Sequence, residues 1–196
     1  VTERKWAQKG LDGGVHGLIA VNNRAGGHAG SRSAEALLDE LRPLGVPVIC
    51  AGGIGTPRQF RQVIDMGYAG AQLGTRFIAT TECNAHPDYK QAIVDATSSD
   101  IVLTERLTGV PVAVINNDYV RRLGTRAGPV ARFMLRNRRM KHWMRTIYAL
   151  KSLYRLKKDL YKHAGAEEYW QAGKSVDGIH GIESAHDIVK KFAAAV

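Results

Sequence analysis

The sequence predicts an α/β fold made of parallel βα units, followed by a mostly helical C-terminal region. Before residue 75, short apolar runs alternate with segments of helical periodicity at a spacing of roughly 25 residues, as in strands joined by crossover helices. Two of these apolar runs end in glycine-rich turns. Neither glycine nor proline occurs from residue 130 to residue 163, which favours one long amphipathic helix or two.

The first unit is a strand between two helices. Residues 2–8 have the pattern of a helix end, and the apolar run over residues 16–22 predicts a strand. A polar, glycine-rich loop over residues 22–30 follows this strand. Ser33 is a good N-cap residue, and apolar positions on one face predict a helix from there to Leu41.

The second and third units repeat this order. Residues 46–50 predict a strand and residues 57–66 a helix, with Thr56 as N-cap, proline at the first helical position and Gly67 as the stop. A third strand is predicted over residues 69–73. Strands connected in this way are parallel, with right-handed crossovers. Three strands cannot close a barrel that needs eight, so we expect them to be the later part of a larger one.

The rest of the chain has a different rhythm. A helix is predicted over residues 87–96, short extended segments over 101–103 and 111–115, and a capped helix over 184–192. The pattern predicts three regions, namely a partial barrel domain over 1–120, a basic helical segment over 121–168 and a barrel-associated C-terminal part over 169–196.

Positive charge is concentrated in the basic helical segment. The chain has a formal net charge of +10, and fourteen Lys and Arg residues against one acid, Asp159, lie between Arg121 and Lys162. Clustered cations give affinity for nucleic acid, but a solvated helix face is the simpler interpretation, so nucleic acid is not an expected partner. A cationic rim that attracts an acidic substrate is the intermediate hypothesis.

Composition limits the environment in which the protein works. The 196-residue chain has no apolar run long enough to cross a bilayer and no signal-peptide pattern at its start. Cys50 and Cys83 are the only cysteines and lack CxxC spacing, and Cys50, in an apolar strand, is expected in the core. A cytoplasmic location without a membrane partner is therefore expected, and a homo-oligomer stays an open hypothesis.

Glycine-rich turns follow the second and third predicted strands. Residues 51–55 and 73–76 would place bare backbone N–H groups at neighbouring strand ends beside a helix N-terminus, which is how α/β proteins hold phosphate. Each turn alone is a weak signal, and neither has the spacing of a dinucleotide fingerprint or a P-loop. Together they predict an anion site, with the Thr75 hydroxyl as a donor. Its predicted members are Gly52, Gly53, Gln72, Gly74 and Thr75.

His28 follows the first predicted strand, in the loop over residues 25–30. Parallel α/β proteins bind ligands at this edge, and Gly26 and Gly27 allow the backbone to approach a planar ligand closely. Imidazole exchanges protons near neutral pH. A loop histidine is most often bonded to its neighbours, but the anion-binding turns on the next two strands favour a catalytic role for His28.

Other polar residues give weaker signals. Asn22 and Asn23 end the first strand and could face a ligand, although turn formation is the commoner role of asparagine there. Arg76 suits an ion pair as well as a phosphate contact. No metal is expected, because the spacing of the five histidines after His28 does not suit a metal site. These are His86, His142, His163, His180 and His186.

The motifs of the chain resemble those of the nitronate monooxygenase family, formerly called 2-nitropropane dioxygenases. Their order and spacing extend over almost the whole sequence, except for residues 121–163. The segments that carry the resemblance are residues 25–30, 46–54, 70–77, 79–83, 107–109 and 169–173.

The resemblance implies an FMN-dependent oxidoreductase. Family members are FMN-binding TIM (β/α)8 barrels with an added helical domain, so the three strands would be the sixth, seventh and eighth of the barrel. His28 would act near the flavin as a catalytic base or a substrate-binding group, and Ala51 stands where relatives often carry serine. The cofactor contacts predicted are Gly26, Gly27, Ala51, Gly52, Gly53, Gln72, Gly74 and Thr75.

The implied reaction oxidises an alkyl nitronate with molecular oxygen to a carbonyl compound and nitrite. The same motifs occur in FMN-dependent enoyl-acyl-carrier-protein or enoyl-CoA reductases and in NADH:quinone reductases. An acyl-thioester substrate is therefore the main alternative to a small nitronate, and the cationic segment favours the acidic thioester somewhat. An inactive fragment, or a nucleic-acid-binding module around residues 121–163, is the further alternative.

Overall fold

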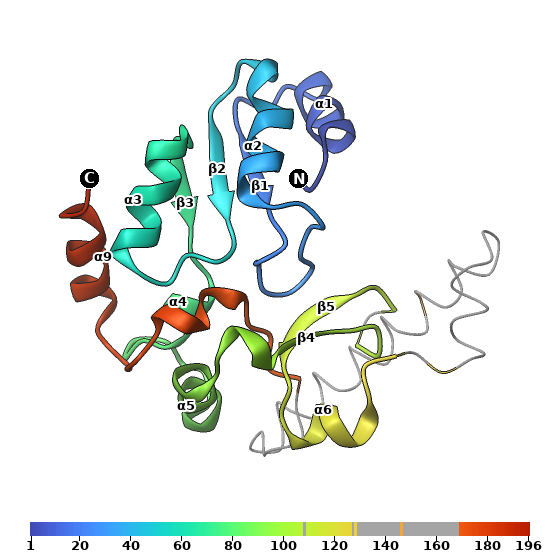
Figure 1. Ribbon diagram of the computed structural model, residues 1–196, viewed down its shortest axis with the longest axis vertical. Coiled ribbons are helices and arrows are strands. Elements are labelled where there is room, and N and C mark those ends of the chain that lie inside the picture. Colours follow the sequence, from blue (N-terminus) through green and yellow to red (C-terminus); the bar gives the residue numbers. More distant parts are fainter. Residues whose placement is uncertain (108, 127, 129–145, 147–168) are drawn as a thin grey trace.

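The computed structural model describes residues 1–107, 109–126, 128, 146 and 169–196. Figure 1 shows a sheet with flanking helices at one end of the molecule, and short helices with a hairpin at the other. The one or two helices predicted over residues 130–163 lie outside the described residues, apart from residue 146, and so does most of the basic helical segment. Within the described part of the chain, no helix has both the length and the apolar character needed to cross a membrane.

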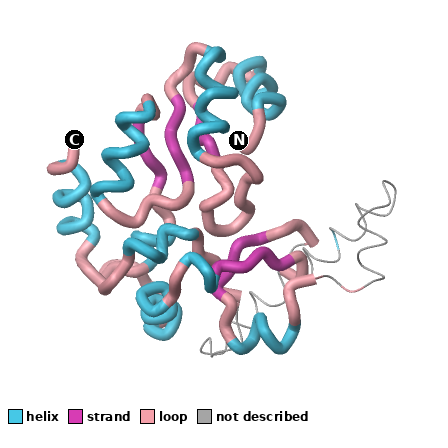
Figure 2. The backbone as a smooth tube through the Cα atoms, viewed as in Figure 1, coloured by secondary structure: helices cyan, strands magenta, loops and turns pink. Residues whose placement is uncertain are grey.

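Three parallel strands form the main sheet, as the sequence predicts. They are β1 (Leu18–Val21), β2 (Val48–Ala51) and β3 (Gly70–Gln72), in the order β1-β2-β3. Their last residues pair in register, so the three carboxyl ends stand level at one edge of the sheet. Figure 2 shows these strands side by side in magenta, with helices on their flanks. The turns that follow the strands are therefore brought together.

Helices α2 (Ala34–Leu41) and α3 (Pro57–Met66) connect the strands and have the predicted bounds. The side chains of Ser33 and Thr56 each accept a hydrogen bond from a backbone N–H of the first turn. Gly67 ends α3 with a φ of +107°, a conformation that glycine adopts without steric cost. Local capping residues therefore mark where both helices begin.

Helix α1 (Arg4–Asp12) is longer than the predicted helix over residues 2–8. It continues through Gly10, whose carbonyl oxygen accepts the N–H of Gly13 at the helix end. The C-terminal helix α9 (Ala185–Ala193) confirms the predicted capped helix, because the Ser184 hydroxyl accepts a hydrogen bond from Asp187 N. Glycine inside α1 costs only about 1 kcal/mol, so it did not stop the helix.

The second part of the molecule holds short helices and an antiparallel hairpin. The predicted extended segments are strands β4 (Ile101–Thr104) and β5 (Val112–Ile115), and they pair with each other. The helical elements there are α4 (Thr75–Ile78), α5 (Pro87–Asp95), η2 (Ser98–Asp100), α6 (Asp118–Leu123) and η3 (Lys174–Gly178), and a further turn, η1 (Arg42–Leu44), follows α2.

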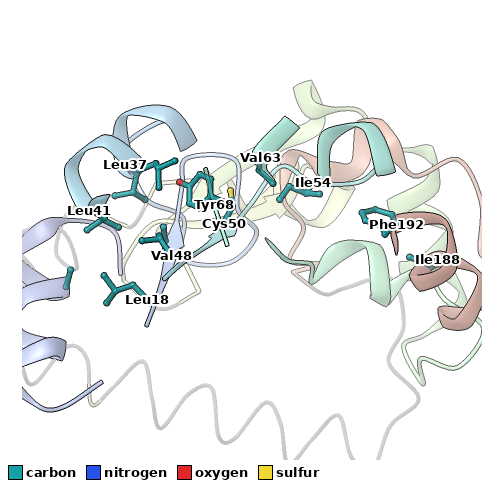
Figure 3. Close-up of a cluster of buried hydrophobic side chains, with 13 residues drawn as sticks. Leu18, Leu37, Leu41, Val48, Cys50, Ile54, Val63, Tyr68, Ile188 and Phe192 are labelled. Atoms are coloured by element: carbon teal, nitrogen blue, oxygen red, sulfur yellow. The ribbon is translucent and has the colours of Figure 1, made fainter. Parts of the chain in front are cut away.

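The largest hydrophobic core lies between the main sheet and its helices (Figure 3). Cys50 is fully buried there, which confirms the sequence expectation. Burial raises the pKa of its thiol to about 11, so the thiol stays protonated at neutral pH. The other labelled members are Leu18, Leu37, Leu41, Val48, Ile54, Val63, Tyr68, Ile188 and Phe192.

Val1 pairs with the open side of β1. Its amino group donates to Ile19 O at 2.6 Å, and its carbonyl oxygen accepts from Val21 N at 2.8 Å. One residue bonded to the two neighbours of the residue opposite is the pattern of a parallel ladder. Val1 therefore stands where a residue of a further parallel strand would stand.

Candidate functional site

A cavity of about 550 Å³ lies at the carboxyl ends of the three parallel strands. It is lined by His28 and by all eight residues predicted as cofactor contacts, and these nine residues come from three separate strand ends. These are Gly26, Gly27 and His28 after β1, Ala51, Gly52 and Gly53 at the end of β2, and Gln72, Gly74 and Thr75 at the end of β3.

The turn after β2 is fixed by the chain itself. Gly52 and Gly53 have φ values of +116° and +79°, which residues other than glycine rarely adopt. A Cβ on Gly52 would lie 2.5 Å from Ala25 N and would also meet the Asn22 side chain. A Cβ on Gly53 would lie 2.6 Å from the Nε of Arg24. Backbone conformation favours glycine at both positions, and the contact with the Ala25 backbone makes the requirement stricter at Gly52 than at Gly53, whose neighbour is a side chain.

Asn22 holds this turn in place. The side chain is 1% exposed, its Nδ2 donates to Gly52 O at 3.0 Å, and its Oδ1 accepts from Arg24 N at 2.8 Å. Of the two roles considered for Asn22, turn formation is the one observed. Asn22 is absent from the described lining residues, so it affects the cavity through the turn that it holds.

The turn after β3 differs, because neither backbone conformation nor packing requires glycine there. Gly74 precedes α4 with a φ of −104°, which any residue adopts, and a Cβ placed on it would meet no atom within 4 Å. Because Gly74 also lines the cavity, the open space beside it is room for a ligand. Thr75, the first residue of α4, is 7% exposed and lines the same cavity.

The His28 loop is attached to the hairpin. Gly27 N donates to Ala113 O at 3.3 Å, and Ala113 N donates to Gly27 O at 2.7 Å. These bonds join the loop to β5 and present His28, an exposed residue of the cavity wall, at its mouth. His28 is thus an exposed residue that also borders the cavity.

Residues 169–178, here called the crossing segment, close another side of the cavity. Gly26 and Gly173 pack backbone against backbone, since a Cβ on Gly26 would lie 2.8 Å from Gly173 N. The closest neighbour of Gly26 is therefore protein rather than open space. Lys174 N donates to Arg24 O at 2.8 Å, which joins the crossing segment to the His28 loop.

Sequence reasoning missed four polar residues of the cavity wall. The Tyr89 hydroxyl donates to the Gln171 carbonyl oxygen, and the Tyr89 ring stacks on Trp170 with centroids 5.8 Å apart. Burial, with a smaller contribution from Cys83, raises the pKa of Tyr89 to about 12, so this hydroxyl stays protonated. Residues 169–173 carried the family resemblance, but no local spacing placed them near the strands. The four are Tyr89, Tyr169, Gln171 and Ser175.

Arg76 is an ion-pair residue. Its guanidinium, with 4% of the side chain exposed, pairs with Glu183 and donates to Gly181 O at 3.2 Å. Lys191 of α9 pairs with the same carboxylate. Arg76 is not among the described lining residues, and its contacts join α4 to the C-terminal part of the chain.

The cavity presents neutral hydrogen-bonding groups. Among the described residues that line it, none is Asp, Glu, Lys or Arg, and His28 is the one histidine. The described residues also hold no cluster of His, Cys, Asp or Glu suited to a metal ion. Backbone N–H groups, a hydroxyl and an amide around open space suit the phosphate of a cofactor such as FMN.

The fold and the site define an α/β protein whose ligand cavity lies at the carboxyl ends of parallel strands. The family model "Nitronate monooxygenase" matches residues 2–194, so the chain belongs to the nitronate monooxygenase family. This family is FMN-dependent.

Individual relatives agree with this assignment. The chain is 32% identical over 124 residues to a "Probable nitronate monooxygenase" of Staphylococcus saprophyticus. The aligned region covers 56% of this chain and 34% of the relative. The chain is also 32% identical over 129 residues to a Mycobacterium tuberculosis protein, "(3aS,4S,5R,7aS)-5-hydroxy-7a-methyl-1-oxo-octahydro-1H-indene-4-carboxyl-CoA dehydrogenase", which is 63% of this chain and 36% of that protein. The chain therefore spans about a third of the length of these curated relatives.

A solved structure has the same arrangement of elements. The structure of FabK from Thermotoga maritima aligns with a TM-score of 0.76 and 25% identity over 100% of this chain and 58% of that chain. The α/β fold with its three-stranded parallel sheet thus matches part of a TIM-barrel enzyme.

Proposed function

We propose that the protein is part of an FMN-dependent nitronate monooxygenase, which converts alkyl nitronates and molecular oxygen to carbonyl compounds and nitrite. The observation that carries the proposal is the convergence of three strand ends on one cavity, with open space beside Gly74. When bound, FMN supplies the electron-transfer chemistry, which protein side chains cannot perform.

The turns after β2 and β3 would hold the FMN phosphate. The glycines there expose backbone N–H groups, and the Thr75 hydroxyl and the Gln72 amide add side-chain donors. Since the described lining residues include no Lys or Arg, binding of the phosphate would depend on neutral donors. Their effect is strongest where water is excluded, and Thr75 and Gly53 are both buried.

His28 would perform the proton transfer. Its imidazole lines the cavity at the end of β1, where it can accept the α-proton of a nitroalkane or donate a hydrogen bond to a nitronate oxygen. The loop bonds between Gly27 and Ala113 hold the ring at this position. The roles of the other side chains are to orient the substrate and to limit the access of water.

We further propose that β1, β2 and β3 are the last three strands of the barrel. The parallel pairing of Val1 with β1 supports this assignment, because it continues the sheet on the side where a preceding strand would lie. The alignment to little more than half of the T. maritima structure agrees with a partial barrel.

A second candidate function is reduction of an enoyl thioester with a nicotinamide cofactor. The observation that favours it is the similarity to the carboxyl-CoA dehydrogenase of M. tuberculosis. The chain is 32% identical to that protein and 32% identical to the probable nitronate monooxygenase of S. saprophyticus. The aromatic wall of Tyr89 and Tyr169 would suit an acyl chain as well as a small alkyl group.

Anaerobic reduction of the flavin separates the two candidates. The FMN-loaded protein is mixed with propionate 3-nitronate or with NADH. Absorbance at about 450 nm, where oxidised flavins absorb, is then followed over time. A nitronate monooxygenase bleaches with the nitronate alone. Bleaching by NADH alone would favour the reductase, and failure to take up FMN would refute both.

A further inference from the structure

A hydrogen bond links the crossing segment to the turn after β3. Gly173 N donates to the Thr75 hydroxyl oxygen at 3.0 Å, and the bond is buried. The two residues are separated by 98 positions in the sequence. This bond therefore brings a distant part of the chain directly onto a predicted phosphate-binding side chain.

The bond decides which role the Thr75 hydroxyl can take. A hydroxyl has one proton to donate and two lone pairs that accept, and an amide N–H can only donate. Because Gly173 N occupies an acceptor position of Thr75, the hydroxyl proton is directed elsewhere. Thr75 lines the cavity, and phosphate oxygens accept hydrogen bonds without donating at full ionisation.

Gly173 can approach this closely because it lacks a side chain. A Cβ on Gly173 would lie 2.6 Å from Gly26 N and 2.7 Å from Arg24 O. Arg24 O is also the acceptor for Lys174 N, so the peptide group after Gly173 is tied to the His28 loop, and the peptide group before it bonds to Thr75. Any added methyl group would move the N–H that bonds to Thr75.

We infer that Gly173 is a positioning residue for the phosphate of the cofactor. Its N–H holds the Thr75 hydroxyl oxygen, so that the hydroxyl proton donates to a phosphate oxygen of FMN. The inference rests on the proposed FMN site and adds to it a residue outside the strand-end turns. It predicts that the crossing segment contributes to recognition of the phosphate in particular, rather than of the flavin ring.

Comparison of FMN with riboflavin, which lacks the phosphate, tests this inference. The dissociation constants of both flavins are measured by fluorescence quenching for the wild-type chain and for Gly173→Ala. We expect Gly173→Ala to weaken FMN binding about tenfold more than riboflavin binding, the effect of one charge-assisted hydrogen bond. Gly181→Ala is the matched control, since a Cβ there meets nothing within 4 Å and Gly181 is absent from the described lining residues.

Two variants of Thr75 keep the test decisive if Gly173→Ala does not fold. Thr75→Val removes the hydroxyl at nearly constant volume and should cause the same selective loss of FMN affinity, whereas Thr75→Ser should retain FMN affinity. An equal loss of affinity for both flavins, or none, in Gly173→Ala and Thr75→Val would overturn the inference while the FMN site stands. A wild-type protein that binds neither flavin would refute the proposed function itself.

Discussion

The turns after β2 and β3 have similar sequences, yet their glycines serve different purposes. Gly52 and Gly53 have positive φ values and are packed against Asn22, Arg24 and Ala25. Gly74 has an ordinary φ, and a Cβ on it would meet no atom within 4 Å. The first turn needs glycine in order to fold, whereas the second has glycine where the chain itself leaves open space. Of the two, the turn after β3 is therefore the better indicator of a ligand.

Loss of the His28 imidazole should have the largest effect and should separate chemistry from binding. In His28→Ala both turns stay intact, so FMN remains bound, while turnover of a nitroalkane falls by about 10² to 10⁴-fold because abstraction of its α-proton is lost. Steady-state nitrite release measures the turnover, and flavin absorbance measures the bound FMN. His180→Ala, a change at an exposed position outside the described cavity wall, is the control. Unchanged nitrite release would remove His28 from its catalytic role.

Gly52→Ala should destabilise the fold more than any other change in the turns. The positive φ and the contact with Ala25 together predict a loss of roughly 3–5 kcal/mol in the free energy of unfolding. Urea unfolding without added flavin measures this loss. A variant as stable as the wild type would show that the turn after β2 can change its conformation, and the contrast between the turns would disappear.

Gly74→Asp should do the reverse and leave stability close to that of the wild type. Aspartate is a favourable residue at the start of a helix, and the structure leaves space for its side chain. Its carboxylate would repel the phosphate, so we expect FMN affinity to fall by about 10²-fold, as a close like-charge pair would produce. Fluorescence titration of FMN measures the affinity, and Gly181→Asp supplies the same charge away from the cavity. Equal FMN affinity in the two variants would contradict the phosphate site.

Gly53→Ala should have the smallest effect. Its φ of +79° lies near the left-handed region, and the atoms that a Cβ would meet belong to the half-exposed Arg24 side chain, which can move. The expected cost is about 1–2 kcal/mol of unfolding free energy. Urea unfolding beside Gly52→Ala provides the comparison, and a larger loss in Gly53→Ala would reverse the order of the two positions.

The parts of the fold that depend on local signals could be predicted. Helix α3 has a cap at Thr56, proline at its first position and Gly67 at its end, and all three features are observed. The strand over residues 69–73 is shorter than predicted, because only Gly70–Gln72 pairs with β2. The pairing of β4 with β5 was not predicted, since no tight-turn signal marks the connection between them.

The strand-end members of the cavity were also accessible from the sequence, because parallel strands place their turns at one edge. The place of the crossing segment in the cavity wall could not be predicted from the sequence, since its contacts join residues far apart in the chain. Gly26 with Gly173 and Gly55 with Gly178 pack in close pairs, and a Cβ on Gly178 would lie 3.0 Å from the carbonyl carbon of Gly55. Each such glycine looks like a loop residue until its partner is known.

The closing contacts of the crossing segment have a consequence for how the protein matures. Synthesis proceeds from the N-terminus, so the three strands leave the ribosome long before the segment that meets Thr75 and Arg24. A nascent chain arrested between β3 and Gly173 would contain every strand-end turn without that buried contact. Tight binding of a ligand is therefore expected only after the crossing segment has been synthesised and has folded against the turns.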